Sequence, residues 1–519
     1  MQLVDNEWGF DVTKTPPFLA FTALRKRAIK DHGEAAILDL SQGEPGYGFA
    51  PSSRSRRFYA FLLLVDTFLN NNERNLLFSK ETVKTCPEIV GKLRVIAEQN
   101  FSPQIAAELI QDLDFFLERL REITKKQGQP QNDFEILYSL FKYSILSGGR
   151  YPDPWGEELV RMVVADLRTR EFGFPVNFQD LILLNGASHG VGTFFSGFGE
   201  EGLNYLKRGD TILMVSPVYA PYTQFVEDRG LKLVNVAIDS ETGKIDEASF
   251  AAALNSAVRI KAIVLVDPSN PSGFSLSQAT LTKLTEIAEK HNSLILSDEV
   301  YAEFFQQNFS LVQIPAARKR LIRLSALSKT ERSTGIRFGD LYLAPEARKF
   351  ITTEILEKDC PGFQAKYKDV QWFFFLAKSY GGRTIGVFQH IAGVPGPSQV
   401  LGLCHLILST EERAAYFRKL EQKVQAFYAA LDLPHYGNNY YGTFDLAKIE
   451  GPQTAQKPIE KVLSEIADQG VILMPACLFF SAADRAKSDK RRFVRVSLPN
   501  LPIADLARAA KLIRKCIEA

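Results

Sequence analysis

The feature that most constrains the fold is the alternation of short apolar runs with helical periodicity through the centre of the chain. Most runs are followed by a turn signal, and a helical stripe such as Leu281, Leu284 and Ile287 often comes next. The runs lie at 181–184, 211–215, 231–236, 262–266, 294–297 and 321–324. This alternation predicts an α/β fold with a mostly parallel sheet. Ligands bind at the carboxyl ends of the strands in such sheets, so polar residues at those ends are candidates for function.

Several reactive side chains lie near the ends of these expected strands. In chain order they are Asn270, Asp298, Tyr301, Lys329 and Arg337. Pyridoxal phosphate needs such a set, because it requires an amine for the Schiff base, an acid for the ring nitrogen, donors for the ring oxygen and a cation for the phosphate. The sequence therefore predicts a pyridoxal 5'-phosphate site.

The segment 51–148 has a different pattern, in which helical stripes occur and no strand pattern is visible. A second helix is expected to begin at Pro103, with Ser102 as its N-cap. The stripe of the first helix is Phe58, Phe61, Leu62, Val65, Phe68 and Leu69, and that of the second is Ile105, Leu109, Leu113, Phe116, Leu120 and Ile123. We expect an inserted helical subdomain that either covers a flank, gates the substrate or contacts a second subunit.

Composition limits the class of protein. A chain of 519 residues is too long for one compact core, so two or more domains are expected. Lys+Arg 62 against Asp+Glu 60 gives a net charge of +2, which is not the pattern of a nucleic-acid-binding protein. The 5 cysteines form no CxxC pair, so we expect neither a disulfide framework nor a metal site, and we expect a cytoplasmic protein. The N-terminus does not resemble a signal peptide, and no apolar run is long enough to span a membrane.

The reactive side chains and their order resemble the aminotransferase class I/II family, pyridoxal-phosphate enzymes of the aspartate aminotransferase fold. The resemblance covers residues 36–50 and 150–519. It implies fold type I, with a mostly parallel central sheet sandwiched by helices and a smaller α+β domain built from both termini. The expected divisions are an N-terminal arm with part of the small domain at 1–50, the helical insertion at 51–148, a large PLP-binding domain at 149–345 and the C-terminal small domain at 346–519.

The resemblance implies a role for each residue around the cofactor ring. Lys329 resembles the Schiff-base lysine, which also moves the proton of the substrate Cα. Asp298 resembles the acid that keeps the pyridine nitrogen protonated, and Tyr219 the aromatic residue that stacks on the ring. Asn270 and Tyr301 resemble the hydrogen-bond donors to the ring O3′. The first asparagine of the family's motif is replaced in this chain by Asp267.

The resemblance also implies a phosphate site. Gly186-Ala187-Ser188 matches the family's phosphate cup at a helix start, where backbone N–H groups and a hydroxyl bind the anion. Arg337 resembles the arginine that offers two parallel donors to the phosphate. The family often has a serine where this chain has Ala326, so one phosphate contact is expected to be either missing or supplied by Ser325 or Ser328.

Three further residues match substrate and subunit contacts. Arg495 resembles the arginine that holds the substrate α-carboxylate in a bidentate pair. Gly43 resembles the N-terminal loop that folds over the substrate. Tyr151 resembles a tyrosine that reaches the phosphate across a dimer interface, which implies a homodimer with shared active sites; its alternative is an aromatic residue in a turn.

The implied activity is transfer of an amino group between an L-amino acid and a 2-oxo acid, with Lys329, Asp298 and Tyr219 as catalytic residues. Two alternatives stay open. The chain resembles the aspartate 4-decarboxylase branch in its length and insertion, although Gln42 stands where that branch has an arginine. The second alternative is a pyridoxal-phosphate-binding protein without catalysis. The expected partners are small molecules and a second copy of the chain, with no nucleic acid and no membrane.

Overall fold

The computed structural model describes residues 8, 10–11, 17–43, 45, 53–69, 86–238, 244–304, 309–380, 393–435, 440–480 and 492–518. The chain forms two compact units, each built from separate stretches of sequence. The first unit comprises Met1–Phe49, Leu206–Leu321 and Ala415–Ala519, and the second comprises Ala50–Tyr205 and Ile322–Ala414. The expected division at 50, 148 and 345 stays a prediction.

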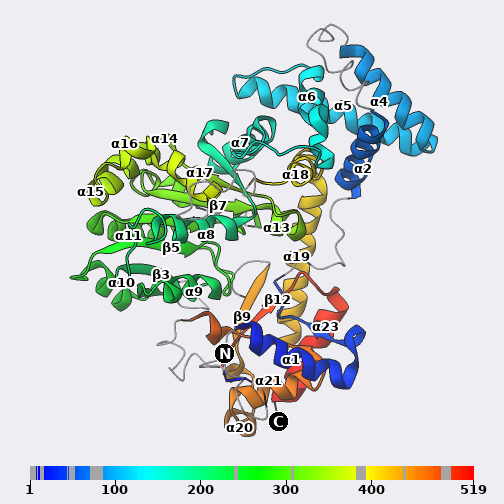
Figure 1. Ribbon diagram of the computed structural model, residues 1–519. Helices are drawn as coiled ribbons and strands as arrows, with labels where there is room; N and C mark the ends of the chain where they lie inside the picture. Colours follow the sequence, from blue (N-terminus) through cyan, green and yellow to red (C-terminus); the bar gives the residue numbers. More distant parts are fainter. Residues whose placement is uncertain are drawn as a thin grey trace. The chain divides into compact units, whose positions relative to one another are not determined.

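The first unit contains a parallel sheet in the order β4-β3-β5-β6, of which β3 and β5 are labelled in Figure 1. These strands are β3 (Thr211–Ser216), β4 (Lys232–Ala237), β5 (Ile260–Val266) and β6 (Leu294–Asp298), and the helices are α9 (Ala220–Asp228), α10 (Glu247–Leu254) and α11 (Gln278–His291). Helices α9 and α10 pack on β4, and α11 packs on β5. Strands β3 and β6 are buried along their whole length, which explains why they read as continuous apolar runs in the sequence.

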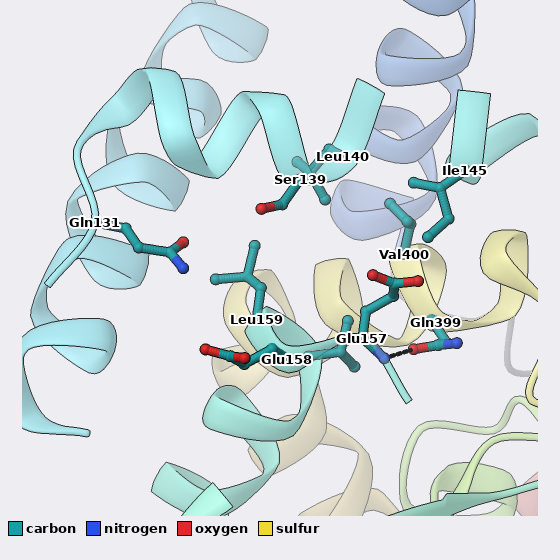
Figure 2. A pocket seen from close by; sticks show the side chains of 10 residues that line it. Gln131, Ser139, Leu140, Ile145, Glu157, Glu158, Leu159, Gln399 and Val400 are labelled. Atoms are coloured by element: carbon teal, nitrogen blue, oxygen red, sulfur yellow. Dashed lines mark hydrogen bonds between the residues drawn. The ribbon is translucent and has the colours of Figure 1, made fainter. Parts of the chain in front are cut away.

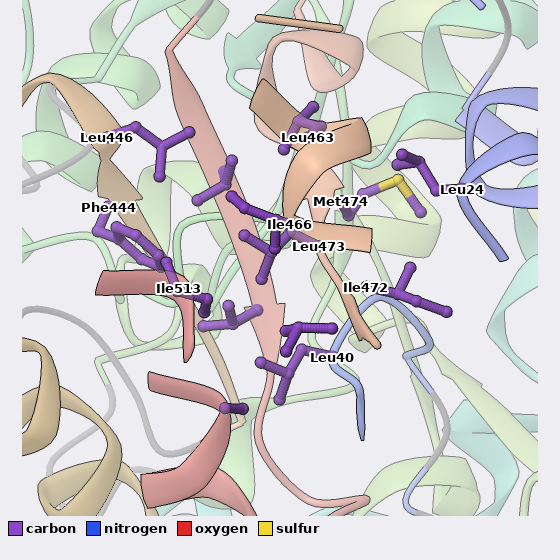
Figure 3. Close-up of a cluster of buried hydrophobic side chains, with 14 of the residues drawn as sticks. Leu24, Leu40, Phe444, Leu446, Leu463, Ile466, Ile472, Leu473, Met474 and Ile513 are labelled. Carbon is purple, nitrogen blue, oxygen red and sulfur yellow. The ribbon is translucent and has the colours of Figure 1, made fainter. Parts of the chain in front are cut away.

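The termini build the other part of the first unit. It contains α1 (Pro17–His32), β1 (Leu38–Asp39), α19 (Thr410–Leu431), β9 (Tyr441–Asp445), α21 (Ile459–Ala467), β10 (Val471–Ile472), β11 (Met474–Pro475), β12 (Phe493–Ser497) and α23 (Ile503–Ile517). Strand β1 pairs in parallel with β10, and β12 lies antiparallel between β11 and β9. Figure 3 shows the shared core, in which Leu40 from the N-terminal stretch packs with Ile472, Phe444 and Ile513 from the C-terminal stretch. Burial of these side chains holds the two ends of the chain together.

The second unit has an antiparallel ladder in the order β2-β8-β7. Its elements include α7 (Glu158–Phe172), β2 (Leu181–Leu184), α8 (Ala187–Phe198), β7 (Leu321–Ala326), α13 (Leu327–Thr330), η7 (Thr334–Ile336), β8 (Gly339–Tyr342), α17 (Val370–Tyr380) and α18 (Gly396–Leu408). The sequence did not indicate β8, because its four residues include a glycine and a charged aspartate. Asp340 is buried in β8 and accepts two hydrogen bonds from Arg168 of α7, which is what makes a charge tolerable there.

The described residues of the insertion, 53–69 and 86–148, form helices joined by short connections. It contains α2 (Ser53–Phe68), α4 (Cys86–Asn100), α5 (Pro103–Lys126), α6 (Asp133–Phe141) and η3 (Lys142–Ser147). The residues of the expected stripes are mostly buried, but Phe68 is 50% exposed and Ile105 36% exposed, and both lie near helix ends. Helix α2 packs on α18, and α5 packs on α7.

The expected fold class is therefore visible in the elements themselves. Parallel strands alternate with helices in the first unit, a small α+β part combines both termini, and a helical insertion interrupts the chain after the N-terminal stretch. Among the described residues, no helix is both long and apolar enough to cross a membrane.

Candidate active site

The first unit places a buried carboxylate at the end of its parallel sheet. Asp298 is the last residue of β6, and its carbonyl accepts a hydrogen bond from Asp267 N, directly after β5, over 3.0 Å. The Asp298 carboxylate oxygen Oδ2 accepts a hydrogen bond from the Tyr222 hydroxyl at 2.5 Å. Burial, followed by the nearby Asp298 charge, raises the pKa of Tyr222 well above its ordinary value, so this phenol stays protonated and donates. Sequence reasoning did not assign Tyr222 a role; its position three residues after Tyr219 was the available signal.

Arg495 is a buried cation beside Asn270. It is 4% exposed, and its Nη1 donates to Asn270 Oδ1 over 3.2 Å while its Nη2 donates to the carbonyl of Ser41. The guanidinium also lies over the ring of Tyr441, 4.6 Å from the centroid. Among the described residues, its Nε has no hydrogen-bond partner, and no carboxylate lies within ion-pair distance of the guanidinium. A buried guanidinium with an unused donor is a site for an anion.

Two tyrosines, Tyr440 and Tyr441, connect Tyr301 to the N-terminal loop. The Tyr301 hydroxyl donates to the Tyr441 hydroxyl over 3.3 Å, and the hydroxyls of Tyr440 and Tyr441 lie 2.9 and 3.4 Å from the carbonyl of Gly43, to which they donate. A Cβ at Gly43 would overlap the Tyr441 hydroxyl, so the loop approaches this closely only with glycine. Tyr440 and Tyr441 were missed from the sequence, and their only signal was two adjacent tyrosines before Gly442.

Tyr219 lies at the start of α9, near both charged groups of the first unit. It is 38% exposed, and its ring centroid is 6.0 Å from that of Tyr222. Partial burial raises the pKa of Tyr219, while the positive charge of Arg495 opposes that shift and the negative charge of Asp298 adds to it. The first unit thus brings Tyr219, Asn270, Asp298 and Arg495 into one neighbourhood.

The second unit holds Lys329 in the short helix α13, directly after β7. Ser328 is buried and Lys329 is half-buried. The backbone here is tied to the next strand, because Leu327 N donates to the carbonyl of Phe338 over 3.1 Å. Ala326 is the N-cap of α13, and neighbouring Ser325 is buried at the end of β7.

The same unit brings Arg337 against the start of α8. Gly186, the N-cap of α8, has φ +80°, and a Cβ at this position would lie 2.6 Å from Arg337 Nη2. The Arg337 guanidinium is exposed and donates to the carbonyls of Thr334 and Asn185 over 3.0 and 3.2 Å. Ser188 is exposed in the first turn of α8. Backbone N–H groups and a guanidinium therefore lie beside one another, as anion binding requires.

Tyr151 lies on the surface of the second unit. It is 70% exposed, in the turn before α7. Its expected role at a subunit interface stays a prediction.

The second unit also has a cavity of about 220 Å³ that none of the expected site residues line (Figure 2). It lies between the insertion, the start of α7 and α18. Its walls include Gln131, Leu140, Glu157, Leu159 and Gln399. Glu157 accepts hydrogen bonds from Arg150 and from Asp153 N, both over 2.9 Å, so the cavity borders the turn that contains Tyr151.

Metal ligands are not grouped in the described part of the chain, where no cluster of three or more His, Cys, Asp or Glu is placed to hold an ion. The chemistry of the two sets of residues is thus that of carboxylate, amide, phenol, amine and guanidinium groups.

Comparison with known proteins identifies the family. The family described as aminotransferase class I and II matches residues 144–513, so the chain belongs to it, and the expected resemblance is confirmed. The insertion lies almost entirely outside the matched segment.

The individual relatives have low sequence identity to this chain. An arginine–pyruvate transaminase of Pseudomonas aeruginosa is 32% identical over 199 residues, and this match covers 38% of the chain and 49% of the relative, about half its length. A bifunctional aspartate aminotransferase and L-aspartate beta-decarboxylase of Pseudomonas sp is 26% identical over 404 residues, covering 71% of the chain and 73% of the relative.

Solved structures confirm the expected fold. Bna3p, a putative kynurenine aminotransferase from Saccharomyces cerevisiae, is similar with a TM-score of 0.61 at 15% identity, covering 100% of both chains. YbdL from Escherichia coli, with a methionine aminotransferase function, has a TM-score of 0.59 at 18% identity, covering 95% of this chain and 96% of its own. At these identities the likeness concerns the fold alone.

Proposed function

We propose that this protein is a pyridoxal-phosphate-dependent aminotransferase that moves an amino group between an L-amino acid and a 2-oxo acid. The observation that carries the proposal is Arg495, a buried guanidinium that donates to Asn270 and whose Nε has no partner in the described part of the chain. An amino acid and a 2-oxo acid share one anionic group, the α-carboxylate, and Arg495 offers it a charge-assisted pair. Family membership supports the same activity.

The residues present fit pyridoxal phosphate. Asp298 is a buried carboxylate that already accepts a hydrogen bond from the Tyr222 phenol. Its negative charge would balance the positive charge of a protonated ring nitrogen. In the second unit, the absence of a side chain at Gly186 leaves Arg337 and the first turn of α8 close enough to share a phosphate. Asn270 and Tyr301 would hold the ring oxygen, and Lys329 would hold the cofactor by its amine.

The bound cofactor supplies an electron sink for breaking a bond at the substrate Cα. Arg495 would bind the α-carboxylate and so fix the direction of the Cα–H bond. Lys329 Nζ would take the proton from Cα, and a positioned base of this kind contributes about 10²–10⁴ in rate. Tyr222 would hold the Asp298 carboxylate in place, and Tyr219 would cover the ring.

We also propose a homodimer in which Tyr151 of one subunit contacts the phosphate of the other, and a cytoplasmic location. The 70% exposure of Tyr151 supports the first of these, because an interface residue is exposed in the single chain. Sedimentation of the purified protein tests the dimer, and Tyr151→Phe should weaken phosphate binding only if the site is shared.

The test of the activity is a half-reaction screen. The purified protein with pyridoxal phosphate is mixed with each amino acid in turn, and the loss of visible absorbance and the formation of pyridoxamine phosphate are measured. We expect at least one amino acid to react and a 2-oxo acid to restore the absorbance. Lys329→Ala should abolish turnover. Normal transamination by Lys329→Ala without added amine would overturn the assignment.

Decarboxylation of aspartate is the second candidate. It is favoured by the match to the bifunctional aspartate aminotransferase and beta-decarboxylase, which covers 73% of that relative. Release of carbon dioxide and alanine from labelled aspartate separates the two reactions. A protein that binds the cofactor but reacts with no amino donor would instead be a binding protein without catalysis.

A further inference from the structure

A buried histidine connects the helical insertion to the segment that follows Lys329. His405 on α18 is 0% exposed, and both of its ring nitrogens lie at hydrogen-bond distance from a serine. Its Nδ1 is 2.7 Å from Ser55 Oγ, and its Nε2 is 3.0 Å from Ser333 Oγ. Ser55 belongs to α2 of the insertion, whereas Ser333 belongs to the loop Glu331–Arg337, hereafter the 331–337 loop.

The imidazole of His405 is neutral in this environment. Burial lowers its pKa to about 3, and the positive charges of Arg56, Arg332 and Arg413 act in the same direction. A neutral imidazole has one donor and one acceptor nitrogen, so one serine donates to the ring and the other accepts from it. The three side chains therefore form a single directed chain of hydrogen bonds.

The 331–337 loop needs such support because its backbone is strained. Arg332 and Arg337 both adopt left-handed conformations, with φ of 51° and 53°, on either side of the turn η7. A residue with a Cβ is unfavourable there, and such conformations persist only where the surroundings hold them. The direction of the Arg337 guanidinium thus depends on what fixes this loop.

Buried contacts fix the beginning of the loop. The Glu331 carboxylate pairs with Arg413 Nε over 2.9 Å and accepts from Ser409 Oγ over 2.7 Å. Ser333 Oγ, besides contacting His405, lies 3.0 Å from the carbonyl of Glu331, to which it donates. Helix α18 packs on both α2 and η7, so His405 lies where the insertion and the loop meet the same helix.

We propose that His405 is a positioning residue through which the insertion, by Ser55, fixes the 331–337 loop and so sets how tightly Arg337 binds the cofactor phosphate. The inference rests on the proposed role of Arg337. It gives the insertion a role besides covering a flank, because the loop is held from outside the segment that matches the family.

The first test measures the dissociation constant of pyridoxal phosphate for Ser55→Ala and Ser333→Ala. Each substitution removes one hydrogen bond from the chain, so we expect each to weaken binding about three- to tenfold. His405→Gln keeps an amide near the Nε2 position and should affect binding less than His405→Ala. Thr124→Val is the matched control, because Thr124 is a buried hydroxyl of the insertion that bonds within α5 and to Gln131 N.

The second test uses the protein without cofactor. Hydrogen exchange of the backbone amides at 331–337 should accelerate in Ser55→Ala, although Ser55 is far from this loop in sequence, and should be unchanged in Thr124→Val. Unchanged exchange and unchanged cofactor affinity in Ser55→Ala would overturn the inference, even if the wild-type protein binds the cofactor and transaminates. Failure of the proposed function is a separate result: the wild-type protein would not bind pyridoxal phosphate, while the effect on exchange would remain.

Discussion

Arg495 Nη1 donates a hydrogen bond to Asn270 Oδ1 over 3.2 Å and so joins residues that lie 225 positions apart in the chain. One is on β12 in the part of the first unit built by the termini, and the other follows β5 of its parallel sheet. A proposed substrate ligand and a proposed cofactor ligand therefore touch directly. A change in the position of the Arg495 guanidinium should therefore also move the Asn270 side chain.

Replacing Arg495 by lysine tests the proposed carboxylate site. A lysine keeps the positive charge but lacks the planar set of guanidinium donors. It therefore cannot hydrogen-bond to Asn270, Ser41 and a substrate carboxylate at the same time. We expect kcat/KM for the amino donor to fall about 10- to 100-fold, as for the loss of a hydrogen bond to a charged group. Stopped-flow measurement of the half-reaction checks this. Arg508→Lys, at an exposed residue paired with Asp505, is the control, and equal rates for both variants would contradict the role.

Tyr222→Phe tests the hydrogen bond to Asp298. The variant keeps the ring and removes the donor at 2.5 Å, so Asp298 is left to the cofactor ring and its backbone neighbours. Loss of one hydrogen bond to a charged group should weaken pyridoxal phosphate binding about tenfold. Fluorescence titration measures it. Tyr428→Phe is a matched buried control, because the Tyr428 hydroxyl donates to a neutral backbone carbonyl, that of Thr443, over 3.4 Å. If the two variants bind equally well, Tyr222 does not position Asp298.

Gly186→Ala and Gly33→Ala separate backbone strain from phosphate binding. Both glycines have a positive φ with an extended ψ, at 80°/166° and 72°/155°, so alanine should cost each position about 1–3 kcal/mol of unfolding free energy. Only at Gly186 would the new Cβ meet Arg337, since no described atom lies within 4 Å of a Cβ at Gly33. We expect similar losses of stability in urea, and a loss of cofactor affinity in Gly186→Ala alone. Reduced affinity in both variants would show that strain, rather than Arg337, is responsible.

The lowered pKa of buried His405 predicts that acid destabilises the second unit. Its pKa is lowered from 6.5 to about 3 by burial and by Arg56, Arg332 and Arg413. The unfolded chain therefore binds a proton that the folded chain does not between these two values. The contribution of neutral His405 to the free energy of unfolding is fully present above about pH 6.5 and is lost as the pH falls toward 3. Urea unfolding at pH 7 and pH 4.5 should show this slope, and His405→Gln should have a smaller one. An identical slope in the variant would assign the acid sensitivity to other groups.

Many of the helices and strands could be predicted from local sequence patterns. Strands β2, β3, β5 and β6 are apolar runs long enough to be recognised, and α5 begins at the expected Ser102 and Pro103. Strand β8 was not recognised, because Asp340 in it is neutralised by Arg168 and Arg323, contacts that no local pattern encodes. Phe68 and Ile105 continue the apolar stripes of their helices and are nevertheless exposed, because periodicity does not show where a neighbouring helix ends.

What the sequence determined by itself was the order of reactive residues, from Asn270 through Lys329 to Arg495, and with it the family. Those residues lie in strands or shortly after them, and a strand is a local property of the chain. The tertiary structure decided which groups share a hydrogen bond: Tyr222 with Asp298, Tyr440 and Tyr441 with Gly43, and Ser55 with His405. Such pairs form between segments far apart in the chain, because burial leaves their polar atoms no water to bind, and only the packed fold brings the partners within reach.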